Sequence, residues 1–204
     1  YMESGMLKED KEKYPIYVFL HKDKVTISID TYKSKTAEEA IKAGADIIND
    51  IWGAKYDKNI AKVAAKYNVP IILMHNREDK PYENLMEDVI NDLQESIDIA
   101  LEAGVKKENI ILDPGIGFAK TYEENLMVMN KCEVIKAMGY PVLLGTSRKS
   151  IIGLTLNLPV TERVEGTVAT TVIGIMKGCE FVRVHDVLEN KRACVMTDAI
   201  LKAK

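Results

Sequence analysis

Residues 110–118 read Ile-Ile-Leu-Asp-Pro-Gly-Ile-Gly-Phe, and this stretch shows in miniature how the chain is organised. Three apolar residues are followed at once by an acid, a proline and a glycine. A short apolar run with such an end is typical of a strand buried on both faces of a parallel sheet. The two glycines let the backbone after the strand approach a ligand closely or turn sharply.

The same pattern recurs along the chain. The apolar runs that we interpret as buried strands are Val25–Ile29, Ala45–Ile48, Pro70–Met74, Ile110–Leu112, Pro141–Leu144 and Phe181–Val184. Amphipathic segments with helical spacing separate them. We expect a helix capped by Thr36 that ends near Gly44, and further helices over about 60–67, 85–101, 126–138, 161–177 and 187–202. The alternation of strand and helix predicts an α/β fold with parallel strands.

Two architectures with parallel strands compete, an open doubly wound sheet and a (β/α)8 barrel. No Gly-x-Gly-x-x-Gly motif follows the first clear strand, which weakens the dinucleotide-binding version of the open sheet. Polar residues follow nearly every apolar run, and in a barrel the chemistry collects where strands end. We therefore predict one barrel-type domain over residues 1–204, with about six of the eight βα units.

Composition narrows the function. The formal net charge of -3 gives no reason to expect a nucleic acid or a membrane as partner. The three cysteines, Cys132, Cys179 and Cys194, favour a reducing compartment, and we expect a cytoplasmic protein. The three histidines lack zinc-ligand spacing, and no metal ligands are identified. Because the first residue is Tyr, we expect the chain to begin inside a longer parent.

Polar groups at the six strand ends would converge on one mouth of such a barrel. Singly, residues such as Asp30, Asn49 and Asp113 are typical helix caps, whereas as a set they suit a flat heterocycle with adjacent N–H and amino groups. The cations of 147–150 suit an anionic substrate. Arg183 and His185, two apart on a strand, would share a side and bind phosphate.

These motifs resemble the dihydropteroate synthases, a family of pterin-binding (β/α)8 barrels. The stretches that carry the resemblance are 28–31, 48–50, 73–75, 112–118, 146–149 and 183–186. The resemblance runs in order from about Val25 to Leu201, and Arg163, Gly166 and Thr167 also match. It implies a transferase of folate biosynthesis, which joins 6-hydroxymethyl-7,8-dihydropterin pyrophosphate to 4-aminobenzoate and releases pyrophosphate.

The resemblance also implies roles for particular residues. The catalytic residues would be Asp30, Asp113 and Lys149. The pterin would be held by Asp30, Asn49, Met74, Asp113 and Lys149, and 4-aminobenzoate by Phe118, Lys149 and Ser150. Arg183 and His185 would hold the pyrophosphate together with Mg²⁺, whose usual Asn contact belongs to a part of the family that precedes this sequence. The family further implies a homodimer and a sulfonamide target.

The sequence departs from the family at its front. The first two strands of the family have no counterpart, and residues 1–22 resemble the helix before the third strand. A barrel without two adjacent strands exposes two edges, so we expect this chain alone to be weakly active or inactive. Two alternatives stay open: a methyltetrahydrofolate-binding methyltransferase barrel, and a non-catalytic pterin-binding fragment. The 147–149 motif argues against the methyltransferase, which receives no aniline carboxylate.

Overall fold

The computed structural model describes residues 16–21, 24–78 and 81–203. They divide into two compact units, residues 1–76 with 90–112 and residues 77–89 with 113–204, which we call the first and the second unit. The expectation that residues 1–204 form one domain stays a prediction. The architecture is α/β with six βα units, as predicted for part of a (β/α)8 barrel.

The first unit is built on a five-stranded sheet with the strand order β1-β2-β3-β4-β5. The strands are β1 Ile16–His21, β2 Lys24–Asp30, β3 Ile47–Asp50, β4 Ile71–Met74 and β5 Ile110–Asp113. β2, β3 and β4 pair in parallel, as their short apolar runs predicted. Side chains such as Ile48, Ile71 and Leu73 are fully buried, so the sheet is the core of this unit.

The expectation of a helix over residues 1–22 is wrong for Ile16–His21, which form strand β1. It pairs antiparallel with β2, from Ile16 opposite Ile29 to His21 opposite Lys24. Its sequence, Ile-Tyr-Val-Phe-Leu-His, is rich in the β-branched and aromatic residues that favour strands. Residues 1–15 and 22, the remainder of that expected helix, lie outside the described residues.

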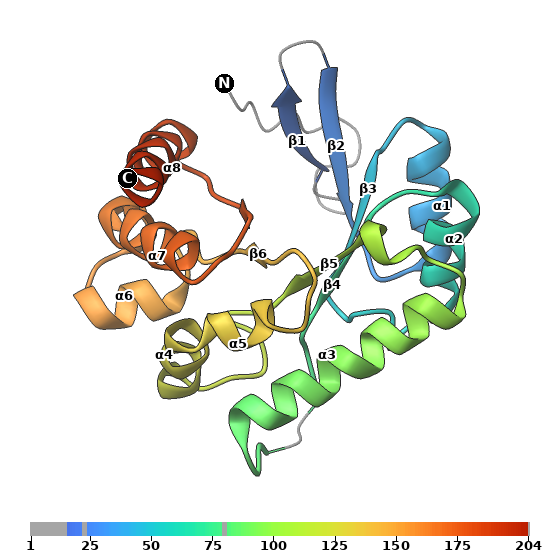
Figure 1. Cartoon of the computed structure of the whole chain (residues 1–204), viewed down its shortest axis with the longest axis horizontal. Coiled ribbons are helices and arrows are strands. Elements are labelled where there is room, and N and C mark those ends of the chain that lie inside the picture. The colour runs from blue at the N-terminus through green and yellow to red at the C-terminus, as the bar shows by residue number, and fades with distance from the viewer. Residues whose placement is uncertain (1–15, 22–23, 79–80, 204) are drawn as a thin grey trace. The chain divides into compact units, whose positions relative to one another are not determined.

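The helices of the first unit are α1 Ser34–Lys42, α2 Asn59–Tyr67 and most of α3 Leu85–Glu102, followed by a short 3₁₀ turn, Lys107–Asn109. α1 packs against α2, and both are visible beside β3 (Figure 1). The prediction that Thr36 caps α1 is wrong, because the helix already begins at Ser34. Asp57 instead accepts the Ser34 N–H at 2.8 Å, so a carboxylate distant in sequence satisfies this helix start.

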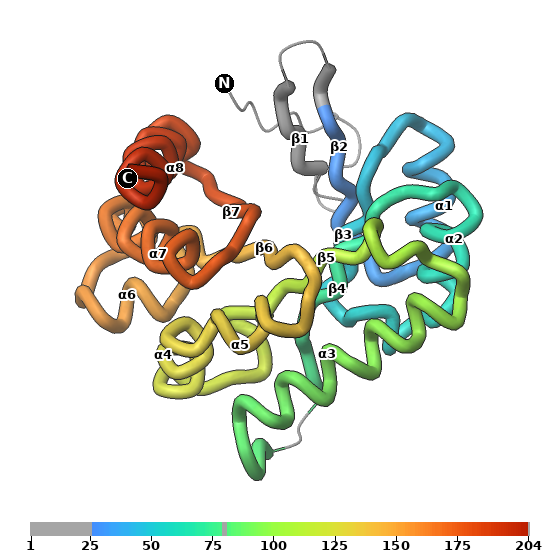
Figure 2. Tube along the Cα trace, in the orientation of Figure 1, coloured from blue at the N-terminus to red at the C-terminus, as the bar shows by residue number. Residues whose placement is uncertain are grey.

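The second unit holds the short parallel strands β6 Leu143–Leu144 and β7 Phe181–Val182, which lie side by side (Figure 2). Its helices are α4 Tyr122–Asn130, α5 Cys132–Lys136, α6 Ser150–Leu156, α7 Val164–Met176 and α8 Val187–Lys202, with a 3₁₀ turn at Val160–Glu162. The single helix expected over 126–138 is therefore two helices that meet at Lys131. α6 was not predicted, whereas the bounds of α8 agree with the expected 187–202.

No helix in the described part of the chain has the length and apolar character that crossing a membrane requires.

Candidate functional site

Asp30 and Asn49 form the polar end of the first unit's sheet. They are register partners on the parallel strands β2 and β3, and Asn49 Nδ2 donates to Asp30 Oδ1 at 2.5 Å. Asn49 is only 1% exposed. Among the side-chain atoms of the described residues, Asn49 Oδ1 is buried and accepts no hydrogen bond. A buried acceptor without a donor is costly, so this oxygen calls for a donor from outside the described chain.

The loop after β3 holds this strand end in place. Both carboxylate oxygens of Asp50 accept backbone N–H groups, from Trp52 at 2.9 Å and from Ala54 at 2.7 Å. Asp50 is fully buried, and this burial raises its pKa to about 6. Gly53 has a φ of 57°, and a Cβ there would lie 2.5 Å from Ser96 Oγ and 3.0 Å from the Met74 carbonyl oxygen. The loop thus packs closely on the end of β4.

Met74 and His75 follow one another at that end of β4. Met74, the expected pterin contact, is 2% exposed. His75 is fully buried, and its Nε2 lies 2.9 Å from Asp92 Oδ2 on α3. This contact ties β4 to α3, which gives His75 a structural role.

Asp113 begins the polar site of the second unit. It is 4% exposed, and its Oδ1 accepts the Gly115 N–H at 2.7 Å. Burial raises the pKa of this carboxyl group, although the charges of Lys149 and Arg183 and the Gly115 N–H act in the opposite direction. Gly145 keeps the space beside it open, since a Cβ there would lie 3.9 Å from Asp113 Oδ2 and 4.0 Å from Arg183 Nε.

Lys149 crosses the loop that the opening sequence stretch singled out. Its Nζ donates to the Ile116 carbonyl and lies 4.7 Å from the centroid of the Phe118 ring. Gly117 has a φ of 83°, and a Cβ there would lie 3.0 Å from Lys149 Cδ. Gly117 therefore allows a close approach, and the approaching group is Lys149. Burial lowers the pKa of Lys149, with the Asp113 charge opposing this effect.

The contacts that hold residues 147–149 in place were not predicted from the sequence. Ser147 Oγ lies 2.8 Å from His185 Nδ1, and Arg148 makes two hydrogen bonds to Asp186, at 3.0 and 2.5 Å. Arg163 donates to the carbonyls of Arg148 at 2.9 Å and Lys149 at 3.3 Å. The Arg163 guanidinium lies where a Cβ of residue 153 would be, so this position requires glycine. Gly153 is therefore the sequence feature that could have indicated the position of Arg163.

The expected strand over Phe181–Val184 ends at Val182, so strand alternation does not reach Arg183 and His185. Their placement follows from tertiary contacts instead. Arg183 donates its backbone N–H to Leu144 O at 3.0 Å, and its side chain lies near Asp113 and Lys149. His185 is exposed and contacts Ser147. Strand alternation therefore does not apply to these two residues, and their shared role at one phosphate site stays a prediction.

The predicted site residues thus fall into two groups. In the first unit, Asp30 and Asn49 are in contact, and Met74 lies on the adjoining strand. In the second unit, Lys149 lies over the Phe118 ring, and the charges of Lys149 and Arg183 act on Asp113. Ser150, an exposed residue, begins α6 directly after Lys149. No group of three or more His, Cys, Asp or Glu side chains in the described part of the chain could hold a metal ion.

Comparison with curated proteins gives close relatives. The chain is 72% identical over 179 residues to the dihydropteroate synthase of Clostridium beijerinckii, covering 87% of this chain and 66% of the relative. It is 62% identical over 177 residues to the dihydropteroate synthase of Bacillus subtilis, covering 87% of this chain and 62% of the relative. The chain therefore spans slightly less than two thirds of the length of these two curated relatives.

Solved structures give the same result for the fold. A crystal structure of dihydropteroate synthase from Clostridium difficile in the presence of pteroic acid matches with a TM-score of 0.84 at 50% identity, covering 86% of this chain and 67% of that one. Dihydropteroate synthase from Yersinia pestis with a pterin–sulfa conjugate matches with a TM-score of 0.84 at 37% identity, covering 88% and 70%.

The profile of the family described as pterin binding enzyme matches residues 6–185. This match includes all the predicted site residues in both units. Together with the relatives at 72% and 62% identity, it establishes the family. The chain belongs to the pterin binding enzyme family.

Proposed function

We propose that the protein carries out the dihydropteroate synthase reaction. In this reaction the C–O bond of 6-hydroxymethyl-7,8-dihydropterin diphosphate breaks, diphosphate leaves, and the amine nitrogen of 4-aminobenzoate forms the new C–N bond with loss of a proton. The names of the relatives and the pteroic acid in the Clostridium difficile structure support this proposal.

The observation that best supports pterin binding is the buried Asn49 Oδ1 atom, which has no hydrogen-bond donor among the described residues. This oxygen is buried and accepts no hydrogen bond from the described residues, while the amide nitrogen of the same side chain is bound to Asp30. The pterin edge offers adjacent ring N–H and amino donors, which suit an amide oxygen beside a carboxylate. Binding of the ring would remove the cost of leaving this acceptor unsatisfied.

Asp113 and Lys149 would supply the electrostatics around the ring. Burial raises the pKa of Asp113, so its carboxylate gains from N–H donors and from positive charge that develops on the pterin when the C–O bond breaks. Lys149 would contact both substrates, because its ammonium group lies over the Phe118 ring and interacts with the Asp113 charge. Phe118 and Ser150 would receive 4-aminobenzoate beside it.

Arg183 and His185 would hold the departing diphosphate. Guanidinium binds phosphate oxygens with paired hydrogen bonds, and stabilising the departing anion favours ionisation of the C–O bond. The aniline nitrogen then attacks the pterin cation, so the chain needs no nucleophile of its own. Ser147 would orient the His185 ring through the contact at Nδ1.

The described residues do not fit a magnesium site. Mg²⁺ prefers oxygen ligands in an octahedral arrangement, whereas the residues proposed to hold diphosphate are an arginine and a histidine. The nearby carboxylate of Asp186 already pairs with Arg148. Magnesium therefore enters the proposal only as an ion that would arrive with the diphosphate, and no step is assigned to it.

The experiment that tests the function measures diphosphate release by the full chain with both substrates, and pterin binding by calorimetry. Release that requires both substrates supports the proposal. Pterin binding without release identifies a non-catalytic pterin-binding fragment, and binding of methyltetrahydrofolate without release favours the methyltransferase alternative.

A variant tests the residue that carries the pterin half. Asn49→Ala removes an acceptor worth about 1.5–3 kcal/mol, so pterin affinity should fall roughly 10- to 100-fold. Asn91→Ala is the matched control, because it removes the same side chain from an exposed position of the first unit. Equal pterin affinity of Asn49→Ala and Asn91→Ala would refute the assignment.

We further propose a cytoplasmic homodimer that binds small-molecule substrates and is inhibited by sulfonamides. Exposed apolar side chains on late helices support the dimer, among them Val195 and Ile200 of α8, which are 63% and 62% exposed. A second copy would remove such side chains from water. The sulfonamide complex of the Yersinia pestis dihydropteroate synthase supports the inhibition. Sedimentation velocity and inhibition of diphosphate release by a sulfonamide test the two proposals.

A further inference from the structure

Two of the three cysteines face each other inside the second unit. Cys132 is the first residue of α5, and Cys179 lies in the connection between α7 and β7. Their Sγ atoms are 3.5 Å apart, although 47 positions separate the two residues in sequence. Cys132 is 0% exposed and Cys179 is 7% exposed, and both are free thiols. Neither residue has a part in the proposed transferase reaction.

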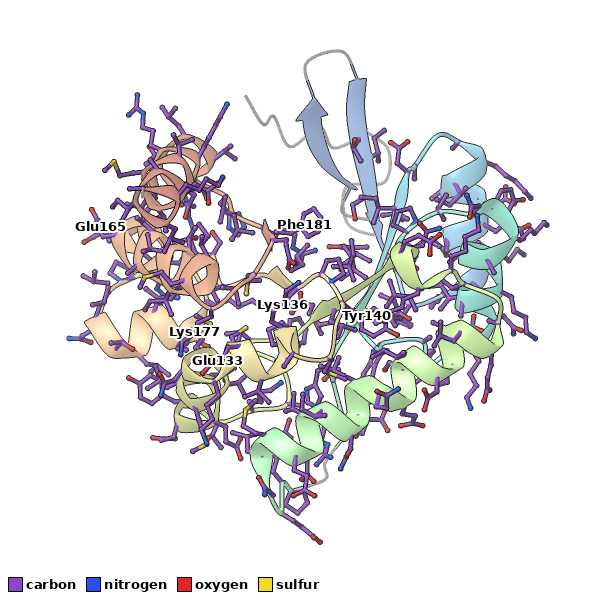
Figure 3. All side chains as sticks on the ribbon, in the orientation of Figure 1. Glu133, Lys136, Tyr140, Glu165, Lys177 and Phe181 are labelled. Carbon is purple, nitrogen blue, oxygen red and sulfur yellow. The ribbon has the colours of Figure 1, made fainter. Side chains whose placement is uncertain are left out.

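Ion pairs on both sides of the thiols fix the register between α5 and the segment that carries Cys179. Lys177 Nζ lies 3.0 Å from Glu133 Oε2, and Lys136 forms an ion pair with Glu180. Figure 3 labels Glu133, Lys136 and Lys177 in this part of the second unit. Because an ion pair flanks the thiols on either side, the two segments cannot slide past each other without breaking charged contacts.

A further hydrogen bond and a glycine hold the second segment. Glu180 Oε2 accepts the Val142 N–H at 2.9 Å, which anchors this glutamate at the start of β6 as well as on α5. Gly178 lies directly against α5, since a Cβ there would be 3.1 Å from Lys136 Cγ. The sulfur atoms therefore face each other in a braced arrangement, and the short distance is a built feature of this contact.

We propose that Cys132 and Cys179 are an oxidation site that closes to an intramolecular disulfide. Bond formation requires the sulfur atoms to approach from 3.5 Å to about 2 Å, a movement that cysteine side-chain rotation can supply. With hydrogen peroxide as oxidant, both S–H bonds and the O–O bond break, one S–S bond forms, and the two thiol hydrogens leave in two molecules of water. The protein is oxidised and the peroxide is reduced.

Either thiol can be the donor in the contact between Cys132 and Cys179. One of the two, as its thiolate, would react with the peroxide to a sulfenic acid, and the sulfur of the other would then displace water from it. Because both side chains are buried, this reaction proceeds through local opening of the α5 contact.

The bridge would enclose part of the proposed site. The loop closed between residues 132 and 179 contains Ser147, Lys149 and Ser150, and Cys179 precedes Arg183 by four residues. Oxidation would thus fix the segments that carry these residues. The inference itself is independent of the proposed transferase function, because it rests only on the contacts between α5 and residues 177–180.

Tryptic peptide mapping of the full chain tests this inference directly. The reduced protein is oxidised for hours with hydrogen peroxide or diamide, alkylated and digested. Trypsin cleaves after Lys131, Lys136, Lys177 and Arg183, so the expected product is peptide 132–136 linked to peptide 178–183, lighter by two hydrogens than the sum of its parts. Cys194, in peptide 193–202, is the internal control and should remain outside this product.

Thermal unfolding supplies the second readout. Closing a loop of this length should raise Tm by roughly 10 °C in the oxidised protein, and dithiothreitol should reverse the change. Cys132→Ser and Cys179→Ser should abolish both the linked peptide and the rise, whereas Cys194→Ser should retain both. Three outcomes would overturn the proposal. The linked peptide could contain Cys194, Cys132 could be over-oxidised without a bridge, or Cys132 and Cys179 could stay unreacted where Cys194 has fully reacted.

Discussion

Asp50 and Asp57 should give the stability of the first unit opposite dependences on pH. Both carboxylates accept two backbone N–H groups: Asp50 from Trp52 and Ala54, and Asp57 from Ser34 and Asn59. They differ in burial, since Asp50 is fully buried and Asp57 is only partly so. This pair therefore separates the effect of burial from the effect of hydrogen bonding.

The magnitude for Asp50 follows from its pKa. Burial raises the pKa from the ordinary value of 3.8 to about 6, although the Trp52 and Ala54 N–H groups act against it. The folded protein therefore binds the proton more tightly than the unfolded chain does. Protonated Asp50 contributes stability that is complete below about pH 4 and lost as the pH rises through about 6, amounting to about 3 kcal/mol.

Asp57 has the opposite sign. Burial raises its pKa, but hydrogen bonds from Ser34 and Asn59 together outweigh burial and hold the pKa below its usual range. The ionised carboxylate of Asp57 therefore stabilises the fold. That contribution is present above the pKa of the unfolded chain and is lost as the pH falls through the pKa of the folded state.

Urea unfolding between pH 2 and pH 7 measures both effects. The chain has one tryptophan, Trp52, which lies in the loop that Asp50 holds, so its fluorescence reports on the first unit. The stability of wild type minus that of Asp50→Asn should fall by about 2.5 kcal/mol as the pH rises from about 4 to 7. The same difference for Asp57→Asn should rise as the pH rises from about 2 to 4. A flat difference for Asp50→Asn, or slopes of the same sign for both variants, would refute the reasoning.

Two further predictions concern the second unit. Arg163→Met removes the donors to the carbonyls of Arg148 and Lys149, so the free energy of unfolding in urea should fall by about 2–3 kcal/mol. In Arg163→Lys it should fall less, because the ammonium group can still donate. Equal stability of the two variants would contradict the role of the guanidinium group. Thr121→Ala removes one partner of the capping box between Thr121 and Glu124 at the start of α4, so the free energy of unfolding should fall by about 1 kcal/mol. Thr161→Ala is the control: this residue makes no capping box, and its substitution should leave the stability nearly unchanged.

Strands β2 and β4 were well predicted because a buried strand needs an apolar run, whereas β1 lies where the sequence predicted a helix. Val25–Ile29 agrees closely with β2, and Pro70–Met74 with β4. The predicted lengths of β6 and β7 were too great, because each of these strands has only two residues. Apolar residues continue beyond these short strands, and periodicity alone cannot tell where pairing with a neighbouring strand stops.

The helices show the same limit. The apolar spacing from Leu126 to Met138 continues across the break at Lys131, so the pattern predicted one helix where there are two. The stretch Thr36-Ala37-Glu38-Glu39 resembled a capping box, but α1 starts three residues earlier, where Asp57 accepts the Ser34 N–H. A contact between residues 23 positions apart leaves no signal in a local window.

The sequence by itself determined the alternation of buried strands with helices and the polar residues that follow the strands, because burial of apolar runs and the chemistry of turns act over a few neighbouring positions. Only the tertiary structure decided which distant groups meet: Asn49 with Asp30, Arg163 with the carbonyl of Lys149, and Cys132 with Cys179. Those meetings depend on the packing of whole elements, which brings together side chains that no local pattern connects.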